Sequence, residues 1–243
     1  MKIFIIIPAY NEREAVNRVI ERAQCYGQVV LVDDGSTDDT LKRVQSCGVL
    51  TLRHCVNCGQ GAALKTGIDY ALASGAEIIV TMDSDGQHRP EEIPQIVKPI
   101  ERGEVDIVLG SRFLEVSTNG TPHNSLRSYA GRAKDHKDCM KFKIPFSKEW
   151  LVLKPAIFFE RLFTGLKLTD VHQGFRAMSR EAAKKIQITQ DKMAHATEII
   201  SEIKRNKLRC KEVPVTVVYN EYGQGMGGAW KILKDLFFKK IVY

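Results

Sequence analysis

The stretch EIIVTMDSDGQH, at residues 77–88, joins a short apolar run directly to a cluster of carboxylates and amides. Similar β-branched runs recur before and after it, and amphipathic stretches of helical period separate them. These patterns predict strands at Ile3–Ile7, Gln28–Val32, Val49–Arg53, Glu77–Met82 and Asp106–Leu109, and helices at Glu12–Gln24, Thr37–Cys47, Gly61–Ala73 and Pro90–Arg102. Strands that alternate with helices predict an α/β fold with a largely parallel, buried sheet.

The regular alternation stops after Gly110. Residues 115–147 are polar, basic and without clear period, which predicts an irregular loop. Regular structure is predicted again as a helix at Trp150–Thr164, a strand at Gly174–Met178, helices after Ser179 and Ala194, and a strand at Glu212–Tyr219. We therefore expect one domain at residues 1–226, followed by a C-terminal amphipathic helix at 227–243 that carries lysines on one face and Trp and Phe on the other.

The composition is that of a globular protein with an acidic partner. The chain has 243 residues, 44% of them hydrophobic and 27% charged, and a formal net charge of +7. Between Arg112 and Lys154 the sequence has nine Lys and Arg but only four Asp and Glu, so most of the excess positive charge lies around the predicted loop. A nucleic acid, an anionic lipid surface or a phosphorylated substrate would suit this charge.

The N-terminal run and the cysteines indicate a cytoplasmic protein. Met1–Ile7 is too short for a signal peptide, and no run reaches the roughly 18 apolar residues of a membrane span. The six cysteines are therefore expected to be reduced, scattered and mostly buried. Cys55 and Cys58 form a CxxC, and His136 and Cys139 an HxxC, so a structural zinc is the alternative.

Polar residues follow four of the predicted strands at the point where each strand ends. They are Pro8–Glu12, Asp33–Thr37, Asp83–His88 and Gly110–Arg112. Ligands of parallel sheets bind outside the carboxyl ends of the strands. The sequence therefore predicts one polar rim that holds the binding site.

Asp83 and Asp85 are the sharpest candidates on this rim. Two carboxylates separated by one residue can meet one hard cation, and Gln87 offers a neutral oxygen to the same ion. This set of oxygen donors suits a Mg²⁺ or Mn²⁺ ion that also binds the phosphates of a ligand. The alternative is an ordinary turn, because Asp, Ser and Gly are turn formers.

Two further segments of the rim have a structural and a functional interpretation. Ser36 or Thr37 could cap the following helix, whereas the adjacent Asp33 and Asp34 suit hydrogen bonds to a ribose or base. The segment NCGQGAA at residues 57–63 could cradle a phosphate, or its glycines could serve close helix packing.

The chain carries six motifs in this order: PAYNE, VDDGSTDDT, NCGQGAA, MDSDGQHRP, GSRF and TDVHQGFR. The ordered set resembles the family 2 glycosyltransferases of GT-A fold, in particular the polyprenyl-phosphate sugar transferases of the dolichyl-phosphate mannose synthase type. The resemblance implies a Rossmann-like GT-A catalytic domain. It also implies a nucleotide-sugar donor, a polyprenyl-phosphate acceptor, Mg²⁺ or Mn²⁺ as cofactor, and peripheral contact with the inner face of the cell membrane through the C-terminal helix.

The resemblance also assigns roles to individual residues. The nucleotide would contact Pro8, Tyr10, Glu12, Val32, Asp34, Lys65, Asp83 and Ser84; the metal ligands would be Asp83, Asp85 and Gln87; and Asp85, Arg112, Asp170 and Arg176 would serve catalysis. Arg112 would face the lipid phosphate, and Asp170 and Arg176 would close the site. A phosphate acceptor is already ionised at neutral pH, so no catalytic base is needed and inversion at the anomeric carbon is expected.

Three alternatives stay open at this point. A saccharide acceptor would require a general base, for which Asp170 or Glu198 are candidates. The basic loop could belong to a nucleic-acid-binding module, although few aromatic residues interleave it and we expect no nucleic-acid partner. A sensor that binds sugar nucleotides without turnover is the third.

Overall fold

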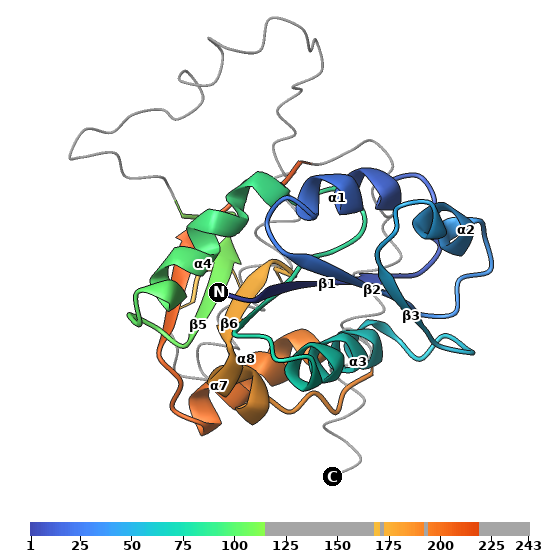
Figure 1. Cartoon of the computed structure of the whole chain (residues 1–243). Coiled ribbons are helices and arrows are strands. Elements are labelled where there is room, and N and C mark those ends of the chain that lie inside the picture. Colours follow the sequence, from blue (N-terminus) through green and yellow to red (C-terminus); the bar gives the residue numbers. More distant parts are fainter. Residues whose placement is uncertain (115–167, 171–172, 192–193, 219–243) are drawn as a thin grey trace, which may run out of the picture.

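The computed structural model describes residues 1–114, 168–170, 173–191 and 194–218 (Figure 1). Seven strands form one sheet in the order β3-β2-β1-β4-β6-β5-β7. The strands are β1 Ile3–Ala9, β2 Gln28–Asp33, β3 Leu50–Arg53, β4 Ile78–Thr81, β5 Ile107–Ser111, β6 Arg176–Ser179 and β7 Cys210–Pro214. The basic loop, the helix predicted at Trp150–Thr164 and the C-terminal helix lie outside the described residues.

The sheet is mostly parallel, as the alternating pattern predicts. β1 pairs in parallel with β2 and β4, β2 with β3, and β5 with β7. β6 alone runs antiparallel, between β4 and β5. The six other strands therefore end at one edge, and the loops that follow them share that edge.

Helices cover both faces of the sheet (Figure 1). They are α1 Val16–Ala23, α2 Thr40–Gln45, α3 Gln60–Ala73, the 3₁₀ turn η1 Pro90–Glu92, α4 Ile93–Glu101, α7 Arg180–Lys185 and α8 His195–Arg205. Along β1, Phe4 and Ile6 pack with α3, α7 and α8, whereas Ile5 and Ile7 pack with α1, α2 and α4. Side chains that alternate along the strand therefore contribute to two hydrophobic cores, one on each face of the sheet.

Two helices begin later than predicted because their first residues serve the rim. α1 begins at Val16 rather than Glu12, whose backbone amide donates to Thr40 Oγ1 at 2.8 Å. α2 begins at Thr40 rather than Thr37. Neither Ser36 nor Thr37 caps it, so the capping prediction is wrong: Ser36 Oγ accepts a hydrogen bond from Asn11 N instead.

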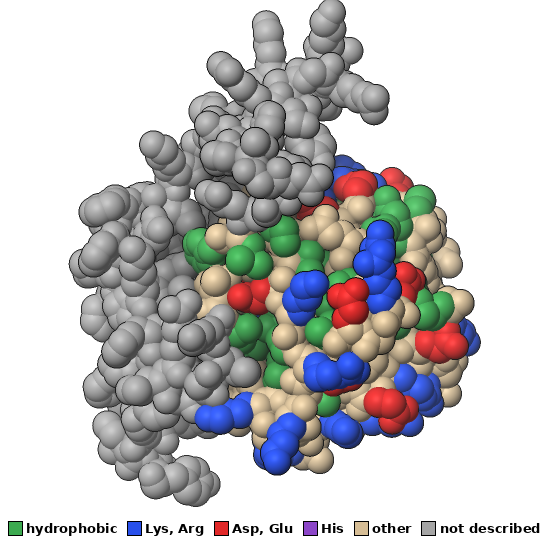
Figure 2. Space-filling view, turned by 90° about the vertical axis from the view of Figure 1, so that its left-hand side faces the viewer, with side chains coloured by type: hydrophobic (Ala, Val, Ile, Leu, Met, Phe, Trp, Pro, Cys, Tyr) green, Lys and Arg blue, Asp and Glu red, His purple; other side chains and the backbone are tan. Residues whose placement is uncertain are grey.

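Charged side chains line the outer edge of the sheet at β7. Arg209 pairs with Asp106 at 2.8 Å, and Lys211 lies 3.5 Å from Glu104. Figure 2, which faces the side where α4, β5 and β7 lie, shows acidic and basic side chains interspersed. Charges at an edge strand discourage pairing with another chain. Within the described ranges, no helix has the length and apolarity of a membrane span.

Candidate active site

The loops after β1 and β2 are fastened to each other at the carboxyl edge of the sheet. Asn11, which has a positive φ of 57°, donates its amide to Ser36 Oγ and accepts from Thr37 N at 2.9 Å. Asp34 N donates to Ala9 O at 2.9 Å. Two of the predicted rim segments therefore form one continuous surface.

Asp83 follows β4, and three neighbours fix its carboxylate. Oδ1 accepts from Gln60 Nε2 at 2.8 Å, and Oδ2 lies 3.0 Å from His88 Nε2. The backbone of Gly174 lies so close that a Cβ there would be 2.4 Å from Oδ2. The side chain keeps 31% of its surface exposed, so it is both oriented and accessible.

Asp85 and Glu12 lie beside Asp83 and share its negative field. Burial raises the pKa of Asp85, and the charge of Asp83 raises it further. Burial also raises the pKa of Glu12, together with the charges of Asp85, Asp38 and Asp83. Burial acts to raise the pKa of Asp83 too, but the hydrogen bond and charge of His88, with Arg176 and His195, lower it overall.

This donor set fits a divalent cation. It consists of carboxylate oxygens, which Mg²⁺ and Mn²⁺ prefer; burial is the main cause of the raised pKa values of Glu12 and Asp85, and the neighbouring carboxylates add to it. The role of Gln87 as a metal ligand stays a prediction. A turn does exist here, because Asp85 Oδ1 accepts from Gln87 N at 2.9 Å. Turn formation explains that bond but not the acids of Glu12 and Asp83 next to it.

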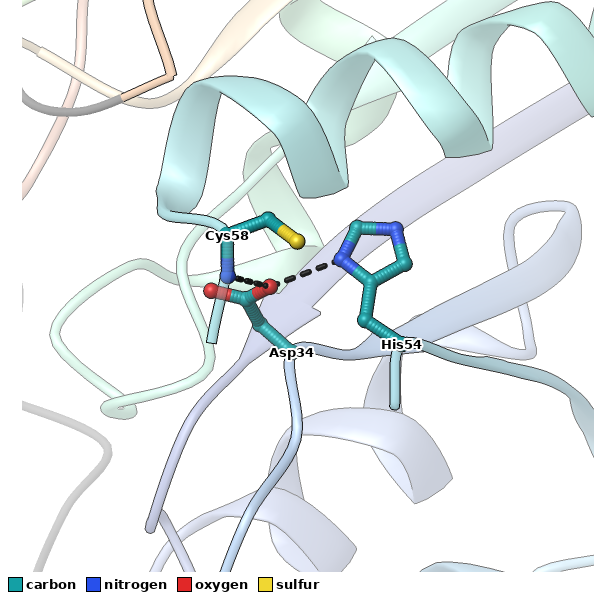
Figure 3. Close-up of side chains that lie close together, drawn as sticks. All are labelled: Asp34, His54 and Cys58. Atoms are coloured by element: carbon teal, nitrogen blue, oxygen red, sulfur yellow. Dashed lines mark hydrogen bonds and ion pairs between the residues drawn. The ribbon is translucent and has the colours of Figure 1, made fainter. Parts of the chain in front are cut away.

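Asp34 holds the loop that leads into α3 (Figure 3). Its Oδ1 accepts from Cys58 N at 2.9 Å and its Oδ2 from Gly59 N at 2.7 Å, while His54 Nδ1 lies 2.7 Å from Oδ1. The carboxylate thus fixes the two residues that precede α3, although it comes from the end of β2. Gln60, which directly follows this loop, donates to Asp83, so the loop connects Asp34 with Asp83.

Arg112 and Asp170 form a two-pronged ion pair at the end of β5. Arg112 Nε and Nη2 donate to the two carboxylate oxygens of Asp170 at 2.7 and 3.0 Å. Glu212 of β7 fixes the segment that carries Asp170, accepting from Asp170 N at 3.0 Å and from Thr169 N and Oγ1 at 2.8 and 2.9 Å. The two predicted residues are therefore brought together, with Glu212 as their support.

Comparison with known proteins assigns the family. Residues 4–187 match the family described as glycosyl transferase family 2. The chain belongs to glycosyltransferase family 2. It is 30% identical to the UDP-N-acetylglucosamine–dolichyl-phosphate N-acetylglucosaminyltransferase of Methanococcus voltae, over 99% of this chain and 95% of that protein. It is 29% identical to the polyprenol monophosphomannose synthase of Mycolicibacterium smegmatis, over 96% and 83%.

The solved structures support the same fold for this glycosyltransferase. Glucosyl-3-phosphoglycerate synthase from Mycobacterium tuberculosis, crystallised with Mn²⁺ and UDP-glucose, superposes with a TM-score of 0.68 at 20% identity. The match covers 98% of this chain and 78% of that one. The predicted α/β fold of GT-A type is confirmed.

The remaining predicted residues of the glycosyltransferase take different positions. Pro8 is buried in β1, Ser84 is buried next to Asp83, and Tyr10 is exposed at the rim. The side chain of Val32 packs in the core under α3, so it does not reach the rim surface. Lys65 is 55% exposed and its ammonium pairs with Asp69 one turn later, so its role stays a prediction.

The role of Arg176 in closing the site from the far side stays a prediction. Arg176 lies fully buried in β6, paired with Thr81 and Leu109 of the neighbouring strands. Its positive charge contributes to the lowered pKa of Asp83. The structure therefore places it beneath the site, inside the sheet.

Four residues that contact the predicted site were not assigned roles from the sequence. They are His54, Gln60, His88 and Glu212. His88 is buried against Phe175, with ring centroids 5.3 Å apart. Gln60 and His88 stand inside quoted motifs, so their motif positions were a usable signal. Glu212 contacts Asp170 across 42 positions of sequence, which no local pattern reveals.

The cysteines differ from expectation in their burial. The five in the described ranges are free, but three are exposed and two are intermediate. The prediction that most are buried is wrong for these residues.

Gly61 serves close packing, which was the structural interpretation of the segment at residues 57–63. Its amide donates to Asp191 O, and a Cβ there would lie 1.9 Å from Gln190 O.

Proposed function

We propose that the protein transfers a sugar from a UDP- or GDP-sugar to a polyprenyl phosphate at the cytoplasmic face of the membrane, with Mg²⁺ or Mn²⁺ as cofactor. The observation that carries the proposal is the acidic cluster of Asp83 and Asp85, which follow β4, and Glu12, which follows β1, in a member of glycosyltransferase family 2. The relatives from Methanococcus and Mycolicibacterium, by their names, act on dolichyl and polyprenol phosphates.

The acidic residues prepare a place for the diphosphate of the donor. Asp83 and Asp85, with Gln87, would hold the cation, and Ser84 stays buried between the two acids. When bound, the cation would neutralise the diphosphate leaving group. Gln60 and His88 fix the orientation of Asp83, so this carboxylate does not have to be ordered when the donor binds.

Pro8, Tyr10, Glu12 and Asp34 would surround the nucleoside. The loops that carry them are tied together through Asn11 and Ser36. A rigid rim lowers the entropy lost on donor binding.

Arg112 would orient the acceptor phosphate. Its guanidinium is held by Asp170 in a planar, two-pronged pair, and the side chain keeps 24% of its surface exposed. The second pKa of a phosphate monoester is about 6, so the nucleophile carries its charge at neutral pH without a base. Direct displacement with inversion at the anomeric carbon follows.

A saccharide acceptor is less well supported because both candidate bases have other partners. Asp170 is paired with Arg112. Glu198 accepts hydrogen bonds from Thr189 and from Gln190 N, and so organises the turn before α8. Neither carboxylate is left to remove a proton from a sugar hydroxyl without breaking these contacts.

Transfer of radiolabelled sugar from a panel of UDP- and GDP-sugars tests the proposal. We expect label in a solvent-extractable, mild-acid-labile lipid, and at least 100-fold less with Asp85→Asn. Asp69→Asn, an exposed acid on α3, is the matched control and should transfer at the wild-type rate. Label only in water-soluble glycan would favour the saccharide acceptor, and the same background-level transfer by the wild type and by Asp85→Asn would favour a sensor.

Membrane contact is proposed for residues 229–243 from their sequence alone. A helix with Trp and Phe on one face and lysines on the other suits an anionic interface. Removing these residues should release the protein from anionic liposomes in a flotation assay. Unchanged flotation would discard this part of the proposal.

A further inference from the structure

Three side chains of unlike chemistry converge where the loop after β3 enters α3 (Figure 3). Asp34, His54 and Cys58 each offer one metal-binding atom, and these atoms all lie within 4.8 Å of one another. Asp34 is buried and His54 half-buried, whereas Cys58 is exposed, so an ion could enter from solvent.

The side chains are already oriented by other residues. Asp34 Oδ2 accepts from Gly59 N at 2.7 Å, and His54 Nε2 lies 3.0 Å from Thr66 Oγ1. Metal-binding histidines usually place their second nitrogen on such a partner, which fixes the ring. Here Nδ1 would face the ion while Nε2–H donates to Thr66.

We propose that Asp34, His54 and Cys58 form a binding site for a thiophilic transition metal such as Zn²⁺ or Co²⁺. Zn–S bonds of about 2.3 Å and Zn–N or Zn–O bonds of about 2.0 Å place tetrahedral ligands roughly 3.3–3.6 Å apart, so small side-chain rotations would suffice. On binding, Cys58 loses its thiol proton to solvent, and water supplies the fourth ligand.

The chemistry of the ligands separates this site from the one at Asp83 and Asp85. Thiolate and imidazole favour Zn²⁺ and Co²⁺, whereas carboxylate and amide oxygens favour Mg²⁺ and Mn²⁺. The two sites are adjoining, because Gln60 stands two residues after Cys58 and donates to Asp83. The protein would therefore sort two kinds of cation along one rim.

Metal binding at Asp34 should also affect donor binding, an effect that rests on the proposed function. Asp34 is expected to contact the nucleoside of the donor, and an ion held by Asp34 would take that carboxylate away. Zn²⁺ would then weaken donor binding, whereas Mn²⁺ would strengthen it.

Cobalt titration of the full chain tests the site without reference to activity. Co²⁺ bound to a thiolate gives a charge-transfer band in the near ultraviolet. We expect the band in the wild type and in Cys55→Ser, and at least tenfold weaker Co²⁺ binding, without the band, in Cys58→Ser. Cys55 is the matched control because it is an exposed thiol of the same CxxC. Equal thermal midpoints of the metal-free proteins would show that folding is unchanged.

Three outcomes would overturn the site: no band in the wild type, a band that persists in Cys58→Ser, or an equal loss in Cys55→Ser. The consequence for the donor is measured separately, by sugar-nucleotide binding with and without Zn²⁺. Weaker binding in the wild type but not in Cys58→Ser supports it. A cobalt band without any effect of Zn²⁺ on the donor leaves the metal site standing and removes Asp34 from the proposed nucleoside contact.

Discussion

Replacement of Gly174 by Ala should disturb the acid that orients the proposed cation. An ideal Cβ at Gly174 would lie 2.4 and 2.5 Å from the two carboxylate oxygens of Asp83. Real Cβ atoms essentially never approach closer than 3.0 Å, so the Asp83 carboxylate must move by about 0.6 Å. The φ of Gly174 is outside the left-handed region, so alanine adds this clash without backbone strain there.

Both catalysis and stability should be affected, and the two effects can be measured separately. A displacement of about 1 Å at a catalytic group can cost about 100-fold, so 0.6 Å predicts a loss of roughly 10- to 100-fold in kcat/KM, with weaker Mn²⁺ binding. Overpacking should lower the free energy of unfolding by about 1–3 kcal/mol. Sugar transfer against Mn²⁺ concentration and denaturant unfolding measure the two effects.

Gly103→Ala is the matched control for this substitution. Gly103 has a φ of +66° and nothing within 4 Å of its Cβ position. It should lose about 1 kcal/mol of stability through strain and keep wild-type transfer and Mn²⁺ affinity. Wild-type Mn²⁺ affinity in Gly174→Ala, or an equal loss in the control, would refute the reasoning about Asp83.

Glu212→Ala should lower the free energy of unfolding by about 1–3 kcal/mol in denaturant titrations and reduce kcat/KM, because Thr169 and Asp170 lose their acceptor; wild-type values would contradict its supporting role. Cation affinity should fall as pH drops through the raised pKa values of Asp85 and Glu12, since only ionised carboxylates bind the ion, and the loss should begin at a higher pH than for ordinary carboxyl groups. Without cation, the stability contributed by these two groups is present below their unfolded-state pKa values and lost as pH rises through the raised folded-state values. Mn²⁺ titrations and thermal melts across weakly acidic pH check both signs.

The sequence was sufficient to predict the α/β layers and the rim. Apolar runs such as Ile3–Ile7 alternate with helical periods, and both signals are local. The polar residues after β1, β2, β4 and β5 follow from the rule on carboxyl ends of parallel strands. Helix starts were less predictable, because Glu12 and Ser36 bond across the rim rather than within their own helices.

The contacts that orient the site could not be derived from local patterns. Asp34 fixes the loop before α3 from 24 and 25 positions away, and Arg112 meets Asp170 across 58 positions. Such pairs depend on which strands lie side by side. The insertion of β6 between β4 and β5 brings Gly174 against Asp83, and nothing in the segment itself signals that antiparallel position.

Anomalous diffraction at the manganese edge, from crystals grown with Mn²⁺ and a sugar nucleotide, would show whether Asp83 and Asp85 hold the cation. We expect one strong peak within coordination distance of Asp83 and Asp85, shared with the donor diphosphate. The peak should vanish in Asp85→Asn and persist in Asp69→Asn. A manganese peak away from the end of β4, or a bound diphosphate with no metal beside these two acids, would contradict it.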